Sequence, residues 1–172
     1  MANPTELQSV LSELGISKED YLFLTIKTVY LYQMKSGEKN VEYRAPSDSI
    51  FTKLYKDFNQ YQFNKPKQLA YVLFQAGYNS DSPRMLIELK GWSYKGENHP
   101  KSLDTFGHPI DSRDVNLILG SIIYENLDMS RETEFRVKAL KEDGRQIKSL
   151  KSRQNIKLKI AGRRSQLGRG DR

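Results

Sequence analysis

The only two histidines of the chain, His99 and His108, stand nine positions apart in one polar stretch and are the first candidates for chemistry. Four acids lie near them in the sequence: Glu97, Asp104, Asp111 and Asp114. Imidazole and carboxylate groups together can hold a metal ion or supply a general base. However, a proline directly follows each histidine, which is typical of extended turns, and the spacing fits no two-histidine helical metal site. We therefore expect no catalytic residue, metal or other cofactor, and keep a metal-dependent nuclease using both histidines as an alternative.

Other reaction types are excluded by residue content. The chain has no cysteine, which excludes disulfides, thiol catalysis, iron–sulfur clusters and the usual structural zinc sites. Gly91 and Gly96 have the outer spacing of a phosphate loop, but Glu97 stands where that loop needs a lysine. With no nucleophile-elbow or dinucleotide motif either, the sequence favours a protein without enzymatic activity.

An aromatic and basic cluster is the first candidate for binding. Trp92, Tyr94 and Lys95 alternate these two side-chain types, with Lys90 and Lys101 close by in sequence. Proteins that bind single-stranded nucleic acid combine such groups, and stacking contributes about 1–3 kcal/mol per base. The alternative is that Trp92 fills the edge of the core. We predict that Trp92, Tyr94 and Lys95 contact nucleic acid.

The charge of the chain is concentrated at its C-terminal end. The whole sequence has 28 lysines and arginines against 21 acids, a formal charge of +7. Residues 1–128 contain 14 basic and 16 acidic residues, a net charge of −2, whereas residues 129–172 contain 14 basic and 5 acidic residues, a net charge of +9. The sequence therefore predicts a near-neutral body over 1–128 and a cationic arm over 129–172.

The cationic arm is the main candidate for a nucleic-acid contact. Asp171 is the only acid after Gly144, and such a segment is more stable along a polyanion than alone because its charges repel one another. An anionic membrane surface fits less well, because residues 163–172 offer only Leu167 as an apolar anchor. The predicted contact residues in the arm are Arg145, Lys148, Lys151, Arg153, Lys157, Lys159, Arg163, Arg164 and Arg169.

The apolar pattern of the body predicts a mainly α-helical fold of about four or five helices. The first starts at Asn3-Pro4 and ends before Gly15, and a second runs from about Lys18 to Gln33. A strand over 21–32 paired with 41–44 is the alternative to that second helix. Further helices are expected over 47–61, 65–77 and 112–127, and a short helix or a buried strand over 83–89.

Residues 10–24 resemble the helix-turn-helix unit of DNA-binding proteins through Leu14-Gly15-Ile16-Ser17 and the apolar residues on either side. Glu19 and Asp20 would then open the recognition helix and repel phosphates. Two ordinary packed helices are the favoured interpretation.

In the arm, residues 135–139 and 156–160 both alternate between apolar and polar side chains, and 141–144 read as a turn. This pattern predicts a basic C-terminal β-hairpin or extended arm. A charged helix broken at Gly144 is the alternative, because lysine, glutamate and arginine also favour helix.

Together these observations predict a non-enzymatic nucleic-acid-binding protein, an accessory or structural subunit of a nucleoprotein assembly with further protein partners. RNA is favoured over DNA, since mixed basic and amide-rich arms commonly fold on RNA. The alternative is a purely structural protein whose arm threads into an acidic neighbour. We expect a cytoplasmic protein with no membrane partner, because residues 1–15 lack a signal-peptide pattern and no stretch approaches the roughly 18 apolar residues of a spanning helix.

Overall fold

A computed structural model of the chain describes residues 4–56, 58, 65–79, 81–94, 102–103, 109–110 and 114–146. The chain divides into two compact units, Met1–Asp128 and Met129–Arg172. Every strand described belongs to the first unit, and the described part of the second unit is helical.

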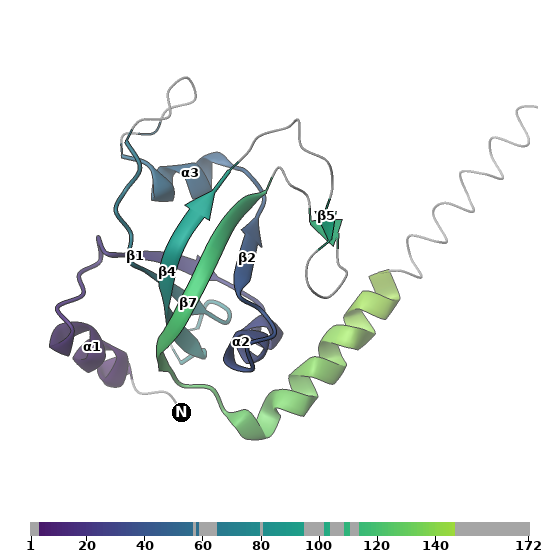
Figure 1. Cartoon of the computed structure of the whole chain (residues 1–172). Helices are drawn as coiled ribbons and strands as arrows, with labels where there is room; N and C mark the ends of the chain where they lie inside the picture. Colours follow the sequence, from purple (N-terminus) through teal and green to yellow (C-terminus); the bar gives the residue numbers. More distant parts are fainter. Residues whose placement is uncertain are drawn as a thin grey trace, which may run out of the picture. The chain divides into compact units, whose positions relative to one another are not determined.

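The prediction of a mainly α-helical body is wrong. The first unit is a mixed α/β fold built on a curled sheet of five strands in the order β1-β3-β4-β7-β2 (Figure 1). The parallel pair is β1 (Tyr21–Thr25) with β3 (Tyr71–Gln75). The antiparallel partners follow across the sheet, β3 with β4 (Arg84–Ser93), β4 with β7 (Val115–Glu125), and β7 with β2 (Val41–Arg44).

Two of the predicted helices are present. The N-terminal one is α1 (Pro4–Glu13), and Gly15 follows it with a φ of 65°, the left-handed conformation that often ends a helix. The helix expected to begin at Ser47 is α3 (Asp48–Leu54), and the Ser47 side chain accepts a hydrogen bond from the backbone N–H of Ile50 at 3.4 Å. α3 is shorter than predicted, because Tyr55 has already returned to an extended backbone.

Residues 18–33 do not form a single helix. They form β1 and then α2 (Thr28–Lys35), so no second helix of a helix-turn-helix unit follows α1. The alternative of a strand over 21–32 is correct only for residues 21–25, because α2 begins at Thr28. Its expected partner is wrong, since β1 pairs with β3 while β2 pairs with β7. Tertiary pairing therefore joins segments that a local hairpin would have kept apart.

Two further predicted helices, over 65–77 and 112–127, contain the strands β3 and β7 instead. Along β7, Val115, Leu117 and Leu119 are buried whereas Ile118 is exposed, which is the two-residue period of a strand. The choice left open for 83–89 is settled as strand β4. Short apolar runs have the same composition in buried helices and buried strands, so the partner strands decided these elements.

The two faces of the sheet carry separate cores. On one face, α2 and α3 pack against the strands, with Leu31 of α2 and Leu54 of α3 fully buried among residues such as Val72 and Leu117. On the other face, Leu7 of α1 packs against Leu73, Leu86 and Tyr124. In Figure 1, α3 lies at the top end of the sheet and α2 at its lower end. Along β3, Val72 and Phe74 therefore belong to one core and Leu73 to the other.

The curl of the sheet brings its two edge strands within reach of one side chain. β4 and β7 pair with irregular register after Leu86, Ile87 and Leu89, and such bulges increase strand twist. Arg44 on β2 donates from Nη2 to the carbonyl oxygen of Thr25 on β1 at 2.7 Å. Its Nε also forms an ion pair with Glu42 Oε1 at 2.9 Å. Arg44 therefore links the two edges of the sheet.

The second unit begins with a short 3-10 turn (Met129–Arg131) and continues as a helix over residues 132–146. This corrects the predicted hairpin, because its first strand, 135–139, and its turn, 141–144, are both helical. Glu132 and Arg136 pair four residues apart at 2.8 Å, a spacing that supports helix and not strand. The predicted second strand, 156–160, lies outside the described residues.

Candidate nucleic-acid interface

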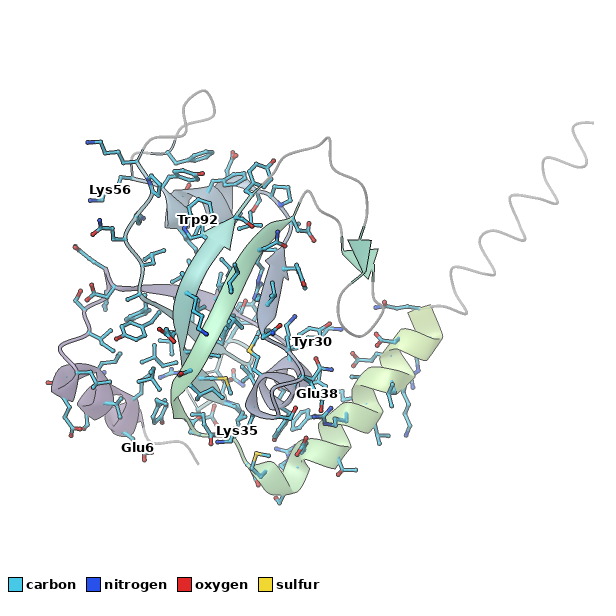
Figure 2. The ribbon with its side chains drawn as sticks, viewed as in Figure 1. Glu6, Tyr30, Lys35, Glu38, Lys56 and Trp92 are labelled. Carbon is cyan, nitrogen blue, oxygen red and sulfur yellow. The ribbon has the colours of Figure 1, made fainter. Side chains whose placement is uncertain are left out.

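Trp92 lies where β4 ends, at the α3 end of the first unit (Figure 2). Trp92 is the next-to-last residue of β4, opposite Leu117 of β7, and Tyr94 follows directly after the strand. Both side chains are half-buried and pack against the larger core. Lys95, the third member of the predicted cluster, lies outside the described residues.

Two aromatic residues contact these rings, Phe51 of α3 and Tyr55, which directly follows α3. The Tyr94 ring meets Phe51 edge-on at 5.0 Å between centroids, and the Trp92 ring meets Tyr55 edge-on at 5.2 Å. Such edge contacts are worth about 0.5–1.5 kcal/mol each beyond the area that they bury. Burial at this junction also raises the pKa of the Tyr55 phenol above 10.0. The cluster is thus a fixed aromatic corner of the fold.

This geometry combines the two interpretations of Trp92. Its edge contact with Tyr55 shows that it helps to close the core, while its partial exposure leaves indole surface in contact with solvent. A ring held in one orientation loses little conformational entropy when a base stacks on it. Base stacking by Trp92 and Tyr94 stays a prediction.

In the cationic arm, the structure describes one of the predicted contact residues. Arg145 lies near the end of the described helix and is exposed. The other arginines and lysines predicted there lie outside the described residues, namely Lys148, Lys151, Arg153, Lys157, Lys159, Arg163, Arg164 and Arg169.

The helix over 132–146 is nearly neutral because its charges balance. Arg131 binds Glu134 through both Nε, at 3.0 Å, and Nη2, at 3.2 Å. The hydrogen bond and charge of Arg131 lower the pKa of the Glu134 carboxyl below 4.5. Residues 129–146 contain 5 basic and 4 acidic residues, a net charge of +1, whereas residues 147–172 contain 9 basic residues and 1 acidic residue, a net charge of +8. The positive excess therefore begins after the described helix.

The histidine stretch holds two short antiparallel strands, β5 (Ser102–Leu103) and β6 (Pro109–Ile110). His99 and His108 themselves lie outside the described residues. In the part of the chain that the structure describes, no three His, Asp or Glu side chains are grouped as metal ligands.

Among the described residues, no helix has the length and apolar character needed to cross a membrane.

A second basic feature was missed in the sequence. Residues 49–70 contain four lysines and one acid, Asp57, a net charge of +3 inside a body whose total is −2. Averaging charge over 128 residues hid this excess, and a shorter window would have shown it. The four residues are Lys53, Lys56, Lys65 and Lys67.

Comparisons of the chain with protein-family models, with curated proteins and with solved structures gave no match. Function is therefore inferred from the charges and contacts of the chain's own residues.

Proposed function

We propose that this chain is a non-enzymatic nucleic-acid-binding protein, an accessory or structural subunit of a nucleoprotein assembly. Its cationic C-terminal segment, residues 147–172, binds the phosphate backbone. The observation that carries the proposal is the stepwise charge distribution, from −2 over 1–128 to +1 over 129–146 and +8 over 147–172.

The ion pairs of the helix leave residues 147–172 as the segment with unbalanced positive charge. Arg131, just before the helix, and Arg136 within it each pair with a glutamate of the helix, so their charge is largely balanced locally. The cations of residues 147–172 have only one acid in the same stretch, Asp171. Phosphates would supply the missing negative charge, and the displaced counterions would supply much of the binding free energy.

Backbone contacts of this kind position a protein but carry little sequence information. The proposed binding is therefore largely independent of sequence, with RNA favoured over DNA because basic, amide-rich segments often fold on RNA. The α/β body would contact the protein partners of the assembly.

The test compares the full chain with a chain ending after Gln146, which keeps the described helix and removes residues 147–172. Binding of a fluorescein-labelled single-stranded RNA is measured by fluorescence anisotropy at several salt concentrations. With about five phosphate contacts, affinity of the full chain should fall about 100- to 500-fold between roughly 50 and 200 mM salt. The shortened chain should lose most of the affinity and most of the salt slope.

The matched control keeps the length of the chain and replaces every lysine and arginine of residues 147–172 by glutamine. It should behave like the shortened chain, because charge carries the binding. Equal affinity and equal salt slope for all three proteins would refute the proposal. Preference for an acidic protein over RNA would instead favour the structural-assembly alternative, and Mg²⁺-dependent loss of the RNA would favour a nuclease that uses His99 and His108.

A further inference from the structure

The four lysines of residues 49–70 come together where α3 ends and where the chain returns toward β3. Lys53 belongs to the last turn of α3 and Lys56 follows it, while Lys65 and Lys67 lie on the segment that leads to β3. We call Lys56 and Lys65 the lysine pair. Figure 2 shows Lys56 at the same end of the unit as Trp92.

Backbone hydrogen bonds fix the register of the lysine pair. Tyr55 and Pro66 form an antiparallel bridge. On either side of it, the Lys56 N–H donates to the Lys65 carbonyl at 2.9 Å and the Lys67 N–H donates to the Leu54 carbonyl at 2.8 Å. Lys56 and Lys65 are therefore directly opposite each other, a placement that puts Cβ atoms about 4.5–5.5 Å apart.

Two like charges in opposite positions destabilise a strand pair, so this arrangement works against folding unless an anion joins it. Both side chains are exposed, and in the described part of the chain no carboxylate pairs with either. The neighbouring lysines are differently engaged. Lys53 Nζ donates to the Phe23 carbonyl at 3.1 Å, and Lys67 Nζ donates to the Thr52 carbonyl at 2.9 Å. The lysine pair therefore presents two exposed cations from opposite positions of one short bridge.

The lysine pair adjoins the aromatic corner in the chain, through Tyr55. Tyr55, which separates Lys56 from α3, is the residue whose ring meets Trp92 at 5.2 Å. The dipeptide Tyr55-Lys56 thereby contains both a cation and the ring that contacts the half-exposed Trp92. Surfaces that bind single-stranded nucleic acid combine cationic groups, which contact the phosphate backbone, with aromatic rings, on which the bases stack.

We infer that Lys56 and Lys65 together bind a backbone phosphate of single-stranded nucleic acid, with the neighbouring base reaching the exposed surface of Trp92. The inference rests on the proposed function for the identity of the anion. It adds a structured contact on the body to the contact made by residues 147–172.

The test uses the full chain and a fluorescein-labelled oligouridylate about 20 nucleotides long. In the variant K56Q/K65Q, affinity at low salt should fall about tenfold, and the salt slope should drop by about 0.7, the value for one single-strand phosphate contact. Quenching of Trp92 fluorescence on saturation should become weaker. The melting midpoint should stay the same or rise, because the substitution removes a like-charge pair.

The control variant K18Q/K27Q removes the same charge from two exposed lysines elsewhere on the body and should stay within about twofold of the unmodified chain. An equal loss of affinity in both variants would overturn the inference, since net charge alone would then explain it. Unchanged binding in K56Q/K65Q, with the chain ending after Gln146 still defective, would overturn the inference and leave the proposed function standing. No binding by the full chain would refute both.

Discussion

Replacing Arg44 by methionine should weaken the fold measurably. Arg44 contacts two polar groups, the Thr25 carbonyl on β1 at 2.7 Å and the Glu42 carboxylate at 2.9 Å. Methionine keeps most of the side-chain volume and removes the charge and the donors. The variant therefore isolates the polar link between the two edge strands.

The expected loss follows from these two contacts. A hydrogen bond to a charged group contributes about 1.5–3 kcal/mol. Glu42 is only 5% exposed and would keep Lys39 as its remaining cation, at 3.2 Å. Leaving a buried carboxylate with half of its partners adds to the loss, although less than the 3–5 kcal/mol typical of a buried charge with none. We expect the free energy of unfolding of R44M to fall by about 2–4 kcal/mol.

Urea unfolding followed by Trp92 fluorescence measures this loss, because the only tryptophan lies in the same unit as the sheet. The matched control is K53M. Lys53 also donates to a carbonyl of β1, that of Phe23 at 3.1 Å, but its side chain is exposed, so we expect a loss below about 1 kcal/mol. A loss for R44M no larger than that for K53M would show that the edges of the sheet hold together without Arg44.

Two further predictions concern the middle and the end of β7. A Cβ at Gly120 would overlap the Glu88 carboxylate, which would swing away and give up the hydrogen bond that it accepts from the Ser121 N–H. G120A should therefore lower the free energy of unfolding by about 0.5–1.5 kcal/mol, the contribution of one hydrogen bond, and should cost less in the E88A background of a double-mutant cycle. Equal costs with and without E88A would show that the new methyl group does not act through Glu88. Burial acts to raise the pKa of Glu125, but the hydrogen bond and charge of Lys35, with a backbone hydrogen bond, outweigh it and lower that pKa below 4.5. The ionised Glu125 carboxylate therefore stabilises the fold above its unfolded-state pKa, and this stabilisation is lost as pH falls through its folded-state pKa. E125Q lacks this carboxylate, so it should lose less stability than the unmodified chain between about pH 5 and pH 3.

The features that could be predicted from the sequence are those set by neighbours in the chain. The Ser47 cap and α1 depend on local backbone geometry and on apolar spacing over about three turns, and both were predicted correctly. The charge imbalance between residues 1–128 and 147–172 needs no structure at all. The same holds for the absence of cysteine chemistry.

The strands β3 and β7 could not be predicted from local patterns, because a strand is stabilised by partners distant in sequence. The apolar runs that became β3 and β7 fit a helix equally well when read alone, and only their pairing with β1, β4 and β2 made them strands. The helix over 132–146 shows the reverse case, where an alternating pattern was overridden by ion pairs three and four residues apart.

The candidate interface divides in the same way. The sequence alone determined which residues are basic or aromatic, and so identified the cationic arm and the cluster around Trp92. The tertiary structure decided that Lys56 lies opposite Lys65, through the register of the Tyr55–Pro66 bridge. It also decided that Tyr55 meets the indole edge-on, through the packing of the residue after α3 against the end of β4. Charge is a property of composition, whereas a binding site needs charges at fixed separations, and those separations are set only when the backbone hydrogen bonds form.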